Sequence, residues 1–307
     1  MVLDAQQMET SLKILILSDK RAGHENQSIA FAKHLNAEFE ILHVDFKNKV
    51  FKLFSYLLDF LYIYTKSLFT CKEVSNKYDF IVSTGSSTYY ANKTLSREKK
   101  TKSIVLMLPK NYRFDFDYIF AQSHDNPLKQ DNIIEIPANF SFIKPKQIYK
   151  PQKKSIGIVV GGNNSIFTMN TKILKNQLDY IKNQFKDYEI AITSSPRTSK
   201  KIEELIESYE FEYSVIFSKN RVNPIPDFLS TCSYVFITID STSMISEAIS
   251  YGDSFVEVLL IDENKNNKFY KMTKTLENSE FVHIFDGKVS NNNKKIDFQR
   301  YAKKVLS

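Results

Sequence analysis

Residues 13–28 read Lys-Ile-Leu-Ile-Leu-Ser-Asp-Lys-Arg-Ala-Gly-His-Glu-Asn-Gln-Ser, an apolar run that ends in a dense group of polar side chains. The run over residues 13–18 is short and almost wholly apolar, which is typical of a strand buried on both faces. A turn and then a helical period over about residues 26–35 follow it. A buried strand, a turn and a helix in that order form the repeating unit of a parallel sheet with crossover helices. The stretch therefore predicts an α/β fold.

The same alternation of strand and helix continues through both halves of the chain. In the first half, strands are expected at residues 39–44, 80–83, 103–107, 118–121 and 133–136. In the second half, the expected strands are residues 155–160, 188–193, 213–217, 234–238 and 254–260, and the expected helices are residues 174–185, 202–209, 243–250 and 298–306. Prolines and lysines interrupt the pattern between residues 144 and 154, as in a linker. We therefore predict two Rossmann-like domains, residues 1–150 and residues 151–307 with a C-terminal helix.

Composition limits the ligand class and the compartment. The net charge of +7 and the pI near 9.0 fit phosphate-bearing ligands, anionic lipid surfaces or nucleic acid. Nucleic acid is the weakest of the three, because the lysines are scattered and no zinc-finger spacing or aromatic RNA-binding signature is present. Cys71 and Cys232 are far apart and lack metal-ligand spacing, which indicates a reducing compartment. Because the first twelve residues also lack the apolar core of a secretion signal, we expect a cytoplasmic protein.

Four of the seven glycines come directly after predicted strands. In open parallel sheets ligands bind at that edge, and a glycine there lets backbone N–H groups approach a phosphate. The alternative is that these glycines only make turns. Because such loops occur in both halves, we predict a ligand cleft between the two domains. The candidate contacts in these loops are Gly23, Gly85, Ser86, Gly161, Gly162 and Asn163.

The first loop is the densest in functional groups. Arg21 can neutralise a phosphate, and His24 is a natural general base near neutral pH. Glu25 or Asp19 could orient His24 or take the role of the base. The alternative is a solvated turn in which Asn26 caps the following helix, which explains Asn26 but neither His24 nor Arg21.

In the second half, Arg197 follows a strand and offers a fork of N–H donors that suits a diphosphate. Ser241 or Ser243 can cap the helix expected at residues 243–250. Glu247 lies one turn inside that helix, where its carboxylate could accept two ribose hydroxyls. The alternatives are a solvated arginine at a helix start and an ordinary surface glutamate. No metal-ligand cluster, Walker lysine or Gly-x-Ser-x-Gly motif is present in the sequence.

Residues 50–69 are rich in large apolar side chains. Lys52, Asp59 and Lys66 recur every seven residues, so on one continuous helix they would share a face. These charges exclude a spanning segment and predict an amphipathic helix. It either packs on the first sheet as a crossover helix or lies on a membrane surface, where its aromatic side chains would enter the interface.

Residues 18–28 resemble the "GRAGHENQ" opening of the mitochondrial-fission "elongated mitochondria" family. Later segments resemble further motifs of that family in the same order: residues 161–163, 193–198, 223–226 and 240–248. The resemblance covers about residues 13–285. Two departures occur, because Lys20 replaces a glycine of the family and Ser-Pro-Arg at residues 195–197 replaces a more basic Ser-Arg-Arg.

This resemblance implies the type-B glycosyltransferase (GT-B) fold, in which two Rossmann-like domains with parallel sheets face one another across a cleft. By similarity to those enzymes, Ser241, Ser243 and Glu247 would bind the donor ribose, while Gly23 and His24 would face the reacting sugar. The implied substrates are a nucleotide-diphospho-sugar donor and a glycan or lipid-linked acceptor, with no cofactor and no metal.

The resemblance also suggests a role in cell-envelope synthesis, and the amphipathic segment at residues 50–69 suggests peripheral association with the inner face of a membrane. The first alternative is a non-catalytic, membrane-associated scaffold that retains the fold. A nucleotide-sugar epimerase ranks third. In most mechanisms it would hold a nicotinamide cofactor, and the G-x-G-x-x-G fingerprint for one is absent.

Overall fold

A computed structural model describes residues 11–74, 76–291 and 294–307 of the chain. The chain divides into two compact units. Unit 1 contains the described residues up to Ile136 together with Phe298–Ser307, and unit 2 is Pro137–Asp297.

Unit 1 is built on a parallel sheet with the strand order β2-β1-β5-β6-β7-β8. Its strands are β1 (Lys13–Ser18), β2 (Glu38–His43), β5 (Phe80–Ser83), β6 (Lys102–Val105), β7 (Tyr118–Gln122) and β8 (Ile133–Ile136). A separate antiparallel pair joins β3 (Asp45–Phe46) to β4 (Phe69–Thr70). All of β1 except Lys13 is buried, as expected for a strand that is covered on both faces.

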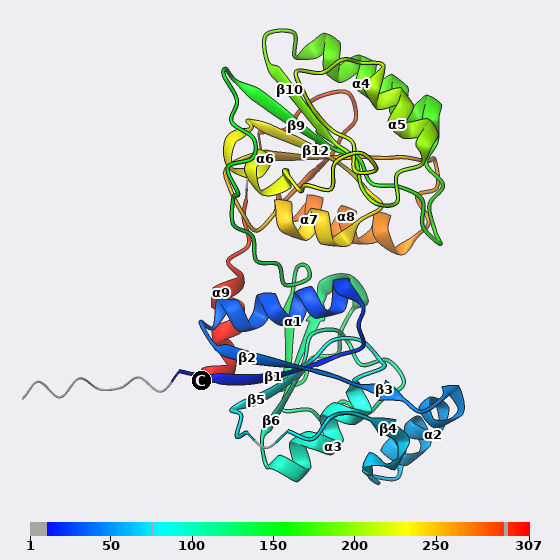
Figure 1. The fold of residues 1–307 in the computed structure, drawn as a ribbon, viewed down its shortest axis with the longest axis vertical. Coiled ribbons are helices and arrows are strands. Elements are labelled where there is room, and N and C mark those ends of the chain that lie inside the picture. Colours follow the sequence, from blue (N-terminus) through cyan, green and yellow to red (C-terminus); the bar gives the residue numbers. More distant parts are fainter. Residues whose placement is uncertain (1–10, 75, 292–293) are drawn as a thin grey trace, which may run out of the picture. The chain divides into compact units, whose positions relative to one another are not determined.

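The helices of unit 1 are α1 (Ala22–His34), α2 (Lys49–Phe60), α3 (Tyr89–Lys99) and α9 (Phe298–Ala302), with the short 3₁₀ helices η1 (Lys66–Leu68), η2 (Ser123–Asp125) and η3 (Lys303–Leu306). Helices α1 and α3 cover opposite faces of the sheet, whereas α2 lies to one side of it, next to β3 and β4 (Figure 1).

Unit 2 repeats this plan with the strand order β11-β10-β9-β12-β13-β14, again with every pairing parallel. Its strands are β9 (Ser155–Val159), β10 (Glu189–Thr193), β11 (Tyr213–Val215), β12 (Tyr234–Thr238), β13 (Phe255–Leu259) and β14 (His283–Ile284). Its helices are α4 (Thr171–Gln184), α5 (Lys200–Glu207), α6 (Ile225–Thr231), α7 (Thr242–Ala248) and α8 (Lys268–Asn278). Helices α4 and α5 cover one face of the sheet, and α7 and α8 cover the other (Figure 1).

Each sheet has one point where the direction of the chain order reverses. In unit 1 this switch point lies between β1 and β5, and in unit 2 it lies between β9 and β12. Ligands of open parallel sheets bind beyond the carboxyl ends of the strands at such a point. The loops singled out in the sequence follow these four strands, apart from the loop of Arg197, which follows the neighbouring β10.

The division between the units differs from the boundary predicted near residue 150. The Asp227 carboxylate accepts the backbone N–H groups of Lys146 (2.7 Å), Gln147 (2.9 Å), Ile148 (2.7 Å) and Tyr149 (3.2 Å), which ties this proline-bearing segment to unit 2. At the other end, α9 packs on α1 in unit 1 rather than in the second domain.

Helix α2 has a wide exposed apolar face. It buries Ser55, Leu58 and Asp59 and packs Phe51 and Tyr56 against the core of unit 1, while the remaining large apolar side chains of the helix and those just after it are exposed: Val50, Leu53, Phe54, Leu57, Phe60, Leu61, Tyr62 and Ile63. The Asp59 carboxylate pairs with buried Lys93 of α3 at 2.6 Å, which fixes the polar side inward. The predicted shared face of Lys52, Asp59 and Lys66 is wrong for Lys66, because the helix ends at Phe60 and Lys66 belongs to η1.

Candidate functional site

At the switch point of unit 1, Asp19 and His24 form a pair. His24 Nδ1 lies 3.0 Å and 3.2 Å from the two carboxylate oxygens of Asp19, whose side chain is only 5% exposed. An ionised carboxylate can only accept hydrogen bonds, so Nδ1 carries the proton in this contact. In the neutral ring Nε2 is then the basic nitrogen, which is the arrangement a histidine needs to remove a proton from a hydroxyl.

The loop before His24 is shorter than we predicted, because α1 begins at Ala22 and not near Asn26. Lys20, with φ of 64°, makes the turn expected of Gly23. Gly23 lies in the first turn of α1, where a Cβ would meet no atom within 4 Å, so neither packing nor backbone geometry requires a glycine there. Asn26 therefore does not cap this helix.

The two other charged residues of this segment have different neighbours. Glu25 accepts a hydrogen bond from Ser18 Oγ at 2.5 Å, so Asp19 is the carboxylate that contacts His24. The Arg21 side chain is 70% exposed, and its Nε lies 3.7 Å from Asp19. A negatively charged ligand can therefore reach Arg21.

Gly85 and Ser86 follow β5 on the other side of the switch point. Gly85 has φ of 90°, and a Cβ there would lie 2.4 Å from the His24 ring. The glycine thus lets the β5 loop pack directly on the catalytic candidate. Ser86 Oγ accepts a hydrogen bond from Lys52 Nζ at 3.1 Å, which brings a residue of α2 to this edge.

At the switch point of unit 2, the Asp240 carboxylate joins three loops. It accepts hydrogen bonds from the Gly162 N–H (2.9 Å), Thr238 Oγ1 (2.7 Å) and Arg197 Nη2 (2.8 Å), and its side chain is fully buried. The loops after β9, β10 and β12 are therefore held together by one carboxylate.

This carboxylate changes the role of the glycines after β9. The Gly161 N–H donates to Thr238 Oγ1 at 2.7 Å and the Gly162 N–H donates to Asp240, so both groups expected to approach a phosphate have partners within the protein. A Cβ at Gly161 would lie 2.2 Å from the Asp240 carboxylate, and one at Gly162 would lie 2.0 Å from the Arg197 carbonyl oxygen. Both glycines are needed for close packing of loops.

Asn163 and Arg197 lie in the loops that this carboxylate joins and have different roles. Asn163 is exposed, and its Oδ1 accepts the Met169 N–H at 2.8 Å. Arg197 keeps 39% of its side chain exposed although Nη2 binds Asp240. Its guanidinium carries five N–H donors, so it can still reach an anion at the carboxyl edge.

Helix α7 carries the three remaining candidates. Ser241 is its N-cap and accepts the Met244 N–H at 3.4 Å, whereas Ser243 lies exposed in the first turn. Glu247 keeps part of its surface exposed, yet burial of the carboxyl group raises its pKa from 4.5 to about 7. Hydroxyl donors from a ligand would favour the ionised form of such a group.

Two residues gained importance only from the structure. Asp240 begins the segment 240–248 that resembles a family motif, and its position just after a predicted buried strand was the one indication in the sequence of its role. Lys52 was interpreted only as part of an amphipathic helix, and nothing in the sequence relates it to Ser86, which is 34 residues away.

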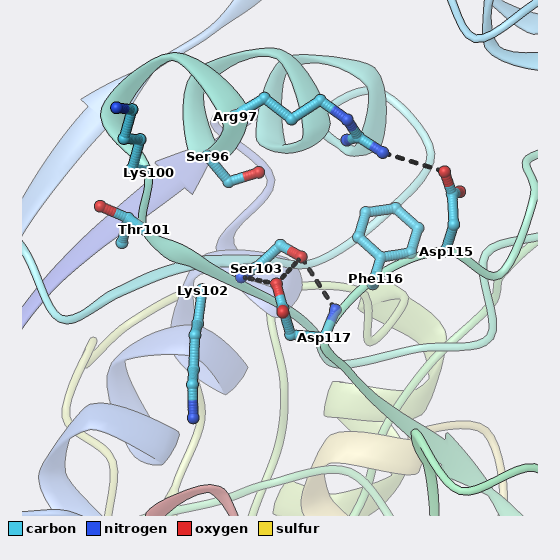
Figure 2. A pocket seen from close by; sticks show the side chains of 9 residues that line it. All are labelled: Ser96, Arg97, Lys100, Thr101, Lys102, Ser103, Asp115, Phe116 and Asp117. Atoms are coloured by element: carbon cyan, nitrogen blue, oxygen red, sulfur yellow. Dashed lines mark hydrogen bonds and ion pairs between the residues drawn. The ribbon is translucent and has the colours of Figure 1, made fainter.

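A cavity of about 440 Å³ opens at the opposite, amino edge of β6 and β7 (Figure 2). Both of its carboxylates are paired within the lining: Ser103 N and Oγ both donate to Asp117 at 2.7 Å, and Arg97 pairs with Asp115 at 2.9 Å. This edge is remote from the switch point of its sheet, so we assign no function to the cavity.

Within residues 11–74, 76–291 and 294–307, no group of three or more His, Cys, Asp or Glu side chains could hold a metal ion. Within those same ranges, every helix is too short or too polar to cross a bilayer.

The fold matches known structures over nearly its whole length. A candidate UDP-N-acetylglucosamine 2-epimerase from Listeria monocytogenes aligns with a TM-score of 0.52 at 12% identity, over 96% of this chain and 95% of that one. The glycosyltransferase SnogD from Streptomyces nogalater aligns with a TM-score of 0.51 at 9% identity, over 90% of this chain and 87% of that one. At these identities the likeness shows the fold alone, and it confirms the expected GT-B class.

Sequence relatives give the family. Uncharacterized protein RP120 of Rickettsia prowazekii (strain Madrid E) is 24% identical over 293 residues, which cover 78% of this chain and 81% of that protein. The family profile described as mitochondrial fission ELM1 matches residues 22–307. The chain therefore belongs to the mitochondrial fission ELM1 family.

Proposed function

We propose that this protein is a metal-independent glycosyltransferase that moves a sugar from a nucleotide-diphospho-sugar to a glycan or lipid-linked acceptor. The observation that carries the proposal is the chemistry at the two switch points. One offers a histidine held by a buried aspartate, and the other offers Arg197 together with the buried carboxyl group of Glu247 in α7.

Unit 2 would bind the donor. Arg197 would contact the diphosphate, and stabilising the departing diphosphate would be its main contribution to the rate. Glu247 would accept the ribose hydroxyls, and those donors would offset the burial that raises its pKa to about 7. The Listeria neighbour is named for a uridine nucleotide sugar, UDP-N-acetylglucosamine, which makes uridine nucleotides the first ligands to test.

Unit 1 would act on the acceptor. His24 Nε2 would take the proton from the attacking hydroxyl while Asp19 stabilises the imidazolium that results. The proton goes to His24, the acceptor oxygen forms the new bond to the anomeric carbon, and the bond to the diphosphate breaks.

The first test is calorimetry with a panel of nucleoside diphosphates and nucleotide sugars. We expect one base class to bind wild type, and Glu247→Ala to weaken that binding at least tenfold, because two hydrogen bonds to a charged acceptor are lost. Glu204→Ala is the matched control, since Glu204 is a helical carboxylate of the same unit that is 63% exposed. Equal affinities in wild type and Glu247→Ala would contradict the proposed ribose contact.

A second measurement separates a transferase from its alternatives. With acceptor extracts present, a transferase releases the nucleoside diphosphate, an epimerase isomerises the nucleotide sugar without releasing it, and a scaffold does neither. His24→Gln should abolish the release, whereas His43→Gln should not, because His43 is exposed in β2. Nucleotide binding without any turnover would favour the scaffold.

We also propose that α2 attaches the protein to a membrane surface. Eight exposed apolar residues occur between Val50 and Ile63, and Lys47, Lys49 and Lys66 flank them in a protein of pI near 9.0. Apolar side chains with flanking cations favour an anionic bilayer. Leu53→Ser with Phe60→Ser should abolish sedimentation with anionic vesicles, and Leu128→Ser, at an equally exposed leucine elsewhere in unit 1, should not.

A further inference from the structure

A cavity of about 300 Å³ lies at the carboxyl edge of unit 1 beside the Asp19–His24 pair. Three segments that are far apart in the sequence line it: the start of α1, the stretch from β3 into α2, and the loop before α3. The charged and polar side chains among its lining residues are Asp19, Arg21, Asp45, Asn48, Lys49, Lys52 and Ser87.

Lys52 is the central cation of this cavity. Its Nζ donates to Ser86 Oγ at 3.1 Å and to Ser87 Oγ at 3.2 Å, and none of the ion pairs found among the described residues includes it. Burial and the nearby Arg21 guanidinium lower the pKa of Lys52, while Asp19 acts in the opposite direction. Two cations therefore approach one another here, with neutral hydroxyls as the hydrogen-bond partners of Lys52.

The acidic residues of the cavity are already paired. Asp45 binds Lys20 Nζ at 2.5 Å, and Asp19, which contacts His24 Nδ1, also lies 3.7 Å from Arg21 Nε. Lys49 and Lys52 therefore leave a surplus of positive charge in the cavity, which an anion would neutralise.

The hydroxyl groups add directed donors to this charge. Because Ser86 Oγ and Ser87 Oγ accept hydrogen bonds from Lys52, each hydroxyl can still donate its own proton. Of the two hydroxyls, that of Ser87 lines the cavity. With the Lys52 ammonium and the Arg21 guanidinium it forms a set of donors that matches the oxygens of a phosphate group.

We propose that this cavity binds a phosphate or diphosphate group carried by the acceptor substrate. Its role as an acceptor site rests on the proposed transferase function, whereas the binding of the anion does not. The same helix that supplies Lys52 exposes Leu53, Phe54 and Leu57, so a phosphate at the headgroup of a lipid would lie next to the apolar face of α2. A soluble sugar phosphate is the other source of the same chemistry.

The test uses inorganic pyrophosphate and the full-length protein. We expect calorimetry to show a binding component that Lys52→Gln weakens at least tenfold and Arg21→Gln weakens to a similar extent. Lys52→Arg should retain it, and Lys47→Gln, which removes the same charge from an exposed position of the same segment, should leave it unchanged. Equal binding by Lys52→Gln and Lys47→Gln, with unchanged melting temperatures, would overturn the proposal.

Vesicles then separate the two sources. If the phosphate belongs to a lipid, vesicles with phosphatidic acid should bind wild type better than vesicles with equally charged phosphatidylglycerol, and Lys52→Gln should remove that preference. Loss of the pyrophosphate component in Lys52→Gln without any preference between vesicles would support the subsite with a soluble phosphate. Absence of both the Lys52-dependent component and the preference would overturn it.

The proposed function can fail separately from this subsite. Lys52 lies in unit 1 and Glu247 in unit 2, so Lys52→Gln should leave nucleotide affinity unchanged. A protein that binds no nucleotide but shows Lys52-dependent pyrophosphate binding would contradict the transferase proposal and retain the anion subsite.

Discussion

The two switch points share a plan but use their carboxylates differently. In each unit a buried aspartate follows a central strand: Asp19 after β1 and Asp240 after β12. Asp240 accepts hydrogen bonds from two other loops and from its own strand end, whereas Asp19 contacts the titratable ring of His24 and lies 3.7 Å from Arg21. One carboxylate builds a binding surface, and the other orients a group that can exchange a proton.

The difference also predicts how each unit tolerates change. A carboxylate that satisfies several buried donors leaves all of them unpaired when it is removed, and unpaired buried groups are costly. A carboxylate that orients one partly exposed histidine leaves less behind, since water can replace it. Removing the aspartate of unit 2 should therefore mainly lower the free energy of unfolding, whereas removing the aspartate of unit 1 should mainly lower activity.

The largest expected effect is that of Asp240→Ala. It removes a fully buried carboxylate from its partly exposed partner Arg197 and leaves the buried Gly162 N–H and Thr238 hydroxyl without their acceptor, so the free energy of unfolding should fall by about 3–5 kcal/mol. Asp19→Ala should lower it by only about 1–2 kcal/mol, while abolishing any activity that depends on His24. Chemical denaturation of both variants measures their free energies of unfolding. Equal decreases in the two variants would contradict the predicted difference.

The next effect concerns the glycines. Gly85→Ala places a Cβ 2.4 Å from the His24 ring at a φ of 90°, so it should cost about 2–4 kcal/mol and displace the ring. Gly23→Ala is the matched control on the same edge, because open space surrounds its Cβ position, and it should change stability by less than about 1 kcal/mol. The His24 ring resonances in NMR spectra would shift strongly in Gly85→Ala and little in Gly23→Ala.

The glycines show how much of the fold and of the candidate site can be predicted from the sequence. Strand periodicity predicted four strands to the residue: β1, β5, β8 and β12. In three of them, β1, β5 and β12, every residue after the first is buried, and such strands are continuous apolar runs with sharp ends. It also predicted which loops lie at the carboxyl edges. It could not tell a glycine that a ligand needs from a glycine that a neighbouring side chain needs, since Gly161 is fixed by Asp240, a residue 79 positions later.

The same limit applies to α2 and to the unit boundary. The composition of residues 50–69 predicted an amphipathic helix, but the inward side is set by the partner of Asp59, buried Lys93, in a helix that the pattern did not reveal. The prolines near residue 150 predicted a linker, whereas the four N–H groups that Asp227 accepts and the ring contact of Tyr149 with Phe228 attach the segment to unit 2. Polar contacts between residues far apart in the sequence thus determine the orientation of α2 and the unit boundary, which local sequence patterns do not specify.

The smallest expected effect is the pH dependence of stability that the carboxyl group of Glu247 causes. Burial raises the pKa of this carboxyl group from 4.5 to about 7, so the folded state holds a proton that the unfolded state releases. Its contribution to stability is therefore full below pH 4.5 and is lost as the pH rises through 7. Glu247→Gln removes this loss, and at pH 8 the variant should be more stable than wild type by about 1–3 kcal/mol, with no difference near pH 4.5.

Ligand binding should show the opposite dependence, because a carboxylate that accepts ribose hydroxyls must be ionised. Wild-type affinity for a nucleotide sugar should rise about tenfold from pH 6 to pH 8, as the ionised fraction of a group with a pKa of about 7 rises by that factor. The diphosphate diester of a nucleotide sugar does not titrate in this range, so it adds no slope of its own. Glu247→Gln should bind weakly and with a flat profile. If instead Glu247→Gln were less stable than wild type at pH 8, a cationic partner would hold the Glu247 carboxylate, as Lys93 holds Asp59 in unit 1.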